Sequence, residues 1–234
     1  MNKHLVLGSR IDAMLDRLYA QSASQNEALG SYFSARAAEP SFDWSSFDAL
    51  ANQFLSDKLV ALDRDKAEFC YHICRALRAR RVVEAGTSFG VSTLFLAAAV
   101  RDNTRDNLRA DPGEGIVIGT EYEPEKAKAA RANFAEAGLS DLIDLREGDL
   151  RETLVGVGSP IDFMLVDIWT PMARPALELV APFLREGAVV ICDNTSQFPD
   201  AYRDYFEFIN DPVNRLRTMT LPFEGGLEFT VRGD

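Results

Sequence analysis

The sequence contains few of the residues that build disulfides or zinc centres. Its 234 residues include three cysteines and two histidines, His4 and His72. Cys70 and Cys74 lie one helical turn apart and Cys192 closes an apolar run, so we expect buried free thiols rather than a disulfide or a metal site. With so little histidine, a zinc centre built on imidazole ligands is not expected.

Long apolar runs and clusters of basic residues are also missing. No stretch approaches the roughly 20 apolar residues of a membrane span, and the N-terminus has neither a sustained apolar core nor a small-residue cleavage site. The default expectation is a cytoplasmic protein without a membrane partner. The formal net charge of −11 would repel a phosphate backbone, which argues against nucleic-acid partners and leaves a small-molecule substrate.

Length and patterning predict one domain with an N-terminal extension. We assign residues 1–57 to a helical extension and residues 58–234 to the main domain. Apolar positions recur at helical spacing between residues 10 and 37, and the polar stretch Gln21–Gln25 predicts two helices rather than one. Phe42, Trp44 and Phe47 follow as an aromatic cluster. The extension is expected to cover a ligand pocket or to form a homodimer surface, with simple core packing as the alternative.

The segment RVVEAGTSFGVS, residues 81–92, is the most informative stretch of the chain. Val82 and Val83 suit a buried strand, Gly86 and Gly90 punctuate a turn, and the Leu- and Ala-rich run from Val91 to Val100 predicts a helix. Strand, glycine loop and helix form the first unit of a nucleotide-binding α/β fold. The glycines allow the backbone to approach a ligand closely.

The position of an acid distinguishes the ligands that this loop could hold. A dinucleotide loop has the pattern G-x-G-x-x-G, whereas this chain has E-x-G-x-x-x-G with Glu84 before the loop. A carboxylate there would repel a pyrophosphate but could accept a hydrogen bond from an ammonium group. S-adenosylmethionine (AdoMet) carries an ammonium, a carboxylate and a sulfonium but no phosphate. An ordinary strand–turn–helix with a surface Glu is the alternative.

Alternating strand and helix patterns continue to the C-terminus and predict a doubly wound, mostly parallel sheet that ends in a hairpin. Ligands bind beyond the carboxyl ends of such strands. Four predicted strands end in an acid and a fifth is followed by one: in order, Glu84, Glu121, Asp149, Asp167 and Asp193. We expect these acids to share one edge of the sheet.

Two of these acids suit a nucleoside. Glu121, at the end of the second strand, can accept both ribose hydroxyls, and Tyr122 beside it could stack on adenine. Asp149 would lie near the adenine amino group. Because Glu152 follows three residues later, Asp149 also fits a helix N-cap, and the two interpretations are compatible.

Asp167, Asp193 and Asn194 follow two consecutive predicted strands, FMLVD and VVICDN. Two carboxylates and an amide oxygen form a hard, all-oxygen set suited to Mg²⁺ or Ca²⁺. The alternative is a pair of unrelated loop acids.

With these residues in place, residues 58–234 resemble the catechol O-methyltransferase-like family of class I AdoMet-dependent methyltransferases, which includes caffeoyl-CoA-type enzymes. The resemblance depends on EAGTSFGVST, IGTEYEPEKAKAARANFAEAGL, EGDLRETL, FMLVDIWT and ICDNT. It implies a seven-stranded Rossmann-like sheet with an antiparallel last strand and AdoMet as methyl donor. It also implies a divalent metal that chelates a small, catechol-like hydroxylated acceptor.

Carried over by position, the resemblance assigns three sets of site residues. The catalytic residue is Asp167 and the metal ligands are Asp167, Asp193 and Asn194. The cofactor-binding set is Val60, Glu84, Gly86, Thr87, Gly90, Ser92, Glu121, Tyr122, Asp149 and Asp167.

One residue departs from the family pattern. The family commonly has a lysine three residues after the first metal aspartate, as general base, and this chain has Thr170. Metal coordination can itself lower the pKa of a bound hydroxyl, so deprotonation without that lysine stays open. Two rival classes also stay open: an AdoMet-binding protein without catalysis, and a nucleotide-dependent oxidoreductase of similar fold.

Overall fold

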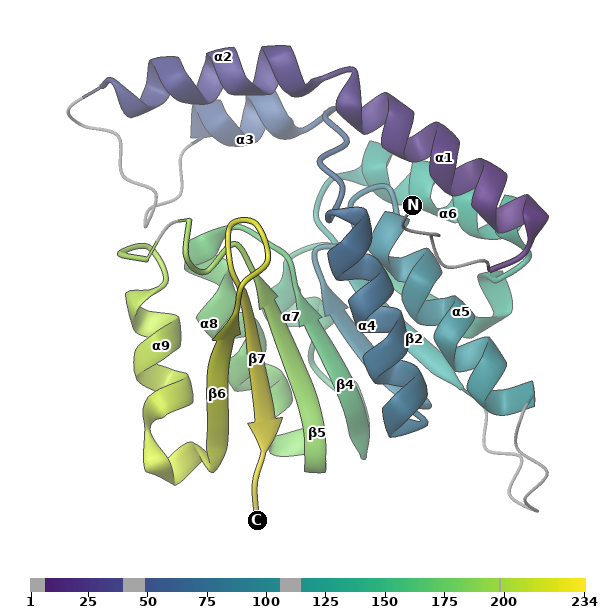
Figure 1. The fold of residues 1–234 in the computed structure, drawn as a ribbon, viewed down its shortest axis with the longest axis vertical. Helices are drawn as coiled ribbons and strands as arrows, with labels where there is room; N and C mark the ends of the chain where they lie inside the picture. Colours follow the sequence, from purple (N-terminus) through teal and green to yellow (C-terminus); the bar gives the residue numbers. More distant parts are fainter. Residues whose placement is uncertain (1–6, 40–48, 106–114, 198) are drawn as a thin grey trace.

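The computed structural model describes residues 7–39, 49–105, 115–197 and 199–234. The predicted aromatic cluster at Phe42, Trp44 and Phe47 lies outside these residues. Within them, helices cover both faces of one central sheet (Figure 1). The predicted α/β class is therefore confirmed.

The sheet has seven strands in the order β3-β2-β1-β4-β5-β7-β6. The first five in this order are parallel, and β7 pairs antiparallel with both β5 and β6. The predicted antiparallel last strand and terminal hairpin are thus confirmed, with β7 inserted between β5 and β6. The bounds are β1 Arg81–Ala85, β2 Ile116–Glu121, β3 Ile143–Glu147, β4 Ile161–Val166, β5 Leu184–Asp193, β6 Leu216–Leu221 and β7 Leu227–Arg232.

Each face of the sheet has its own hydrophobic core, because the central parallel strands are apolar on both sides. One face packs on α4 (Arg64–Leu77), α5 (Val91–Arg105) and α6 (Pro124–Ala137). The other packs on α7 (Leu150–Thr153), α8 (Thr170–Val180) and α9 (Arg203–Asn210). The helix after the glycine loop extends five residues beyond the predicted end at Val100, since its start is fixed by the loop and its end carries no glycine or proline signal.

The N-terminal extension forms α1 (Ser9–Ala23), α2 (Asn26–Ala37) and α3 (Ala49–Leu55). The predicted division into two helices is confirmed, whereas α3 was not predicted. Buried residues of α1 join the core of the face covered by α4, α5 and α6: Ile11, Met14, Leu15 and Leu18. In Figure 1, α2 and α3 lie above the upper ends of the strands, and the stacked rings of Tyr32 and Phe54 connect them.

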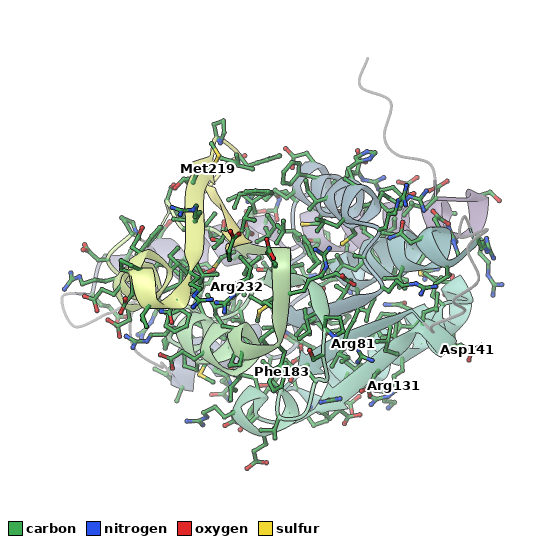
Figure 2. All side chains as sticks on the ribbon, turned by 90° about the horizontal axis from the view of Figure 1, so that it is seen from below. Arg81, Arg131, Asp141, Phe183, Met219 and Arg232 are labelled. Atoms are coloured by element: carbon green, nitrogen blue, oxygen red, sulfur yellow. The ribbon has the colours of Figure 1, made fainter. Side chains whose placement is uncertain are left out.

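Figure 2 looks at the opposite end of the sheet, where β1 begins at Arg81 and β7 ends at Arg232. Short 3₁₀ turns at Ser140–Leu142, Ala181–Phe183 and Pro212–Asn214 complete the described elements. Of the helices in the described residues, none combines the length and the apolar character needed to cross a membrane.

Candidate functional site

A cavity of about 510 Å³ opens at the carboxyl ends of the parallel strands. Its walls come from the loops after β1, β2, β3 and β4 and from α2 and α3 above them. Most residues of the predicted cofactor set line it: Val60, Gly86, Thr87, Ser92, Glu121, Tyr122, Asp149 and Asp167. Residues from five separate segments of the chain therefore meet in one hollow, as the strand-end argument predicts.

The glycine loop lies directly against the end of β4. Gly86 has a φ of 100°, and a Cβ atom there would lie 1.9 Å from the carbonyl oxygen of Asp167. At Gly90, with a φ of 85°, a Cβ would lie 2.3 Å from the ring of Phe134. Both positions need glycine, because each has a positive φ and leaves no space for a Cβ atom. Gly86 lines the cavity, whereas Gly90 packs against Phe134 and is not among the lining residues.

Replacing Gly86 with alanine is expected to lower the free energy of unfolding by about 3 kcal/mol or more, since the clash with backbone adds to the cost of a positive φ. Gly138→Ala is the matched control. Gly138 also has a positive φ, 71°, but nothing lies within 4 Å of its added Cβ, so the cost should be about 1 kcal/mol. Urea unfolding of both variants measures the difference, and equal losses would contradict the close approach of this loop to β4.

Glu84 lies beneath the loop, not in the cavity wall. The residue is fully buried and accepts hydrogen bonds from the hydroxyls of Thr87 at 2.9 Å, Ser92 at 2.7 Å and Thr93. Burial raises the pKa of this carboxyl, and the three hydroxyls act in the opposite direction. Two of these hydroxyl residues, Thr87 and Ser92, line the cavity, so Glu84 supports the cavity wall from beneath.

Glu121 joins the cavity to the glycine loop. Its Oε2 accepts a hydrogen bond from the backbone N–H of Ser88 at 2.6 Å, and its Oε1 accepts one from Glu123 at 2.8 Å. The side chain is 9% exposed and lines the cavity. These two contacts hold the carboxylate at the end of β2, while Tyr122 beside it is 64% exposed with its ring free to cover a ligand.

Asp149 caps α7, as the sequence predicts. It accepts a hydrogen bond from the backbone N–H of Arg151 at 2.9 Å and forms an ion pair with the Arg151 side chain. The Arg151 contact lowers the pKa of the Asp149 carboxyl. Asp149 also lines the cavity, so the capping and ligand-binding interpretations remain compatible.

Asp167 and Asp193 place two carboxylates side by side at the ends of β4 and β5. Burial, and then the charge of Asp193, raise the pKa of Asp167 well above its usual range. No hydrogen bond to the Asp167 carboxylate comes from the described residues, and this side chain faces the cavity. Asp193 is 4% exposed, and its Oδ1 accepts a hydrogen bond from Lys66 Nζ at 2.8 Å.

The chemistry of this set fits a hard divalent cation. Two neighbouring carboxylates form an oxygen site in which Asp167 has no hydrogen-bond donor from the described chain and Asp193 is paired with one cation, Lys66. The third predicted ligand, Asn194, has a φ of 60° and its Oδ1 lies against the turn at Gly225. The described residues contain no cluster of three or more His, Cys, Asp or Glu side chains arranged for a metal, so any cation here depends on two carboxylates and an amide.

Several site residues were not predicted from the sequence. Lys66 was not singled out from the sequence, although it shares the helical spacing of the buried Cys70 and Cys74 and could have been found by it. Lys126 and Trp169 line the cavity, and burial lowers the pKa of Lys126. Phe33 of α2 closes the cavity from the extension, which no local pattern signals.

The strand order and the cavity at the strand ends are those of a class I methyltransferase fold. Residues 83–195 match the family model described as a methyltransferase domain. The O-methyltransferase from Bacillus cereus, solved in complex with SAH, aligns with a TM-score of 0.64 at 21% identity, over 92% of this chain and 99% of that chain. At this identity the structural match shows the fold alone.

The chain is also similar in sequence to curated O-methyltransferases. The catechol O-methyltransferase of Mycobacterium tuberculosis is 30% identical over 58% of this chain and 57% of its own length. That of Niastella koreensis is 27% identical over 58% of each chain. The chain spans less than three fifths of the length of these curated relatives. Over these residues the chain is similar to class I O-methyltransferases.

Proposed function

We propose that this protein is an AdoMet-dependent O-methyltransferase that moves a methyl group to a hydroxyl of a small acceptor. The observation that carries the proposal is the single cavity shared by the glycine loop, Glu121 and Asp167. These three features come from the ends of β1, β2 and β4, and each suits a different part of the reaction. The M. tuberculosis and N. koreensis relatives, both catechol O-methyltransferases, support a hydroxylated aromatic acceptor.

AdoMet would lie along the carboxyl ends of the strands. The loop at Gly86, Thr87 and Ser92 would hold its methionine part through backbone and hydroxyl groups that Glu84 keeps in place from below. Glu121 would accept the ribose hydroxyls, which is the role of an acid at this strand end in nucleotide-binding folds. Tyr122 and Asp149 would contact the adenine, with Val60 at the cavity mouth.

The acceptor would lie beside Asp167, where its oxygen attacks the AdoMet methyl group in line. This chain acts mainly by alignment and by exclusion of water, since α2 and α3 cover the strand ends through Phe33 and Leu55. Asp167 and Asp193, with Asn194, would hold a divalent cation. Such a cation, when bound, stabilises the oxyanion of the acceptor and lowers the pKa of its hydroxyl. Thr170 begins α8 and cannot serve as the general base.

Two measurements on the purified protein test this function. Titration calorimetry with AdoMet is expected to show one site per chain. Methyl transfer to a panel of catechols is then followed with Mg²⁺ and with EDTA, and chelation should reduce turnover by at least about 100-fold, given the several kcal/mol that a metal contributes. Unchanged turnover in EDTA would remove the cation from the proposal, and absence of AdoMet binding would refute it as a whole.

A second candidate is an AdoMet-binding protein without catalysis. Thr170, in the position of the usual lysine, is the observation that favours it. AdoMet binding with no turnover on any hydroxylated acceptor would support this alternative. A nucleotide-dependent oxidoreductase is disfavoured by the two-glycine loop, and a fluorescence titration with NADH should show no binding.

A further inference from the structure

Lys66 is buried beside the paired carboxylates. It lies in the first turn of α4 with its side chain 1% exposed. Its Nζ is 2.8 Å from Asp193 Oδ1 and 3.1 Å from Asp63 Oδ2. Lys66 thus connects the start of α4 to the end of β5, two segments 127 residues apart.

This placement opposes the general preferences of lysine. Lysine is almost never fully buried unless it is paired, and a cation in the first turn of a helix faces the positive end of the helix dipole. The neighbouring Arg64 shows the ordinary arrangement, because its guanidinium pairs with the exposed Asp16 at the surface. The attraction that keeps Lys66 buried therefore comes from its two carboxylate partners, mainly the buried Asp193.

The charges at this point can be counted. Asp167 and Asp193 together carry −2 when ionised, and Lys66 brings this three-residue set to −1. The carboxyl of Glu84 also acts on Asp167, but it is bonded to three hydroxyls beneath the glycine loop and is counted apart from the set. Asp63 is 55% exposed, so water screens most of its charge. A divalent cation would change the charge of this three-residue set to +1, whereas without Lys66 the same cation would leave the two carboxylates neutral.

We propose that Lys66 is a permanent counter-ion of the Asp167–Asp193 pair. By occupying Asp193 Oδ1 it weakens the binding of a divalent cation. When the cation is bound, the site then carries a positive charge that attracts an ionised acceptor oxygen. This inference rests on the proposed function. A loaded charge of +1 complements one oxyanion, so the site favours an acceptor that binds deprotonated. Lys66 is a positioning residue in this scheme, since within the described chain neither it nor Asp193 lines the cavity.

Lys66→Met tests the inference, with Lys66→Arg as the matched control that keeps the charge. Mn²⁺ binding is measured by calorimetry on protein saturated with S-adenosylhomocysteine. Methionine is expected to tighten Mn²⁺ binding by tenfold or more, because a repelling charge near the ligands is lost. Arginine should leave it within about threefold of the original protein. The affinity for S-adenosylhomocysteine is measured first as a check of folding, and it should be the same in the original protein, Lys66→Met and Lys66→Arg. If Lys66→Met does not bind S-adenosylhomocysteine, Lys66→Gln is used in its place.

A second measurement reads the charge of the loaded site directly. 4-Nitrocatechol changes its absorbance when it ionises, so spectra of the bound probe report its charge with Mn²⁺ present. The bound 4-nitrocatechol should ionise at a lower pH in the original protein than in Lys66→Met. Weaker or unchanged Mn²⁺ binding in Lys66→Met would overturn the inference, as would absence of Mn²⁺ binding in both proteins. Failure to bind S-adenosylhomocysteine in the original protein would instead refute the proposed function.

Discussion

Glu121→Ala is expected to weaken AdoMet binding by about 100-fold or more. The carboxylate would accept both ribose hydroxyls, and hydrogen bonds to a charged group contribute roughly 1.5–3 kcal/mol each, with 1.4 kcal/mol per tenfold in affinity. The same carboxylate accepts the N–H groups of Ser88 and Glu123, so its loss also loosens the glycine loop. Titration calorimetry with AdoMet measures the effect.

Glu125→Ala is the matched control for this prediction. Glu125 lies in the first turn of α6, four residues further along the chain, and its side chain is 86% exposed in a surface ion pair with Lys128. Its removal should change AdoMet affinity by less than about twofold, as expected for a screened surface pair. Equal effects of the two substitutions would mean that overall negative charge, rather than a contact at the end of β2, governs AdoMet binding.

Asp167→Asn is expected to reduce methyl transfer by at least about 100-fold while AdoMet affinity changes little. The amide keeps the shape of the side chain but removes a charge that would hold the cation, which contributes several kcal/mol to the transfer step. The melting temperature should stay equal or rise, because the substitution relieves repulsion between the neighbouring carboxylates of Asp167 and Asp193. Initial rates at saturating AdoMet and a thermal melt test both parts.

Asp141→Asn, on the exposed turn before β3, is the control and should leave both quantities unchanged. A fall in melting temperature together with activity would identify Asp167 as a structural residue. Full activity in Asp167→Asn would exclude it from the reaction site.

The sequence was sufficient for features whose causes are local. Val82 and Val83 followed by Gly86 and Gly90 specify strand, tight turn and helix, because the apolar run must be buried and the turn needs positive φ. The shared edge then follows from the parallel arrangement, because the carboxyl ends of parallel strands lie together and so bring Glu121 and Asp167 to one cavity.

Features that depend on contacts between distant segments were not predictable in this way. The hydroxyls of Thr87, Ser92 and Thr93 converge on Glu84 only when the loop has folded over β1, and so the burial of that acid is invisible in the sequence pattern. Lys66 was not identified from the sequence because a charged helix residue is normally solvated, whereas here the pairing with Asp193 keeps it buried. The extension was expected to cover a pocket or to form a dimer surface, but which of its residues reach the cavity depends on packing across the strand ends, which periodicity does not encode.

A crystal structure with bound S-adenosylhomocysteine tests the central claim most directly. The ligand should occupy the cavity at the strand ends, with both ribose hydroxyls within hydrogen-bond distance of Glu121 and the sulfur on the side of Asp167. A ligand bound elsewhere on the molecule, or one in this cavity whose ribose does not reach Glu121, would contradict the account.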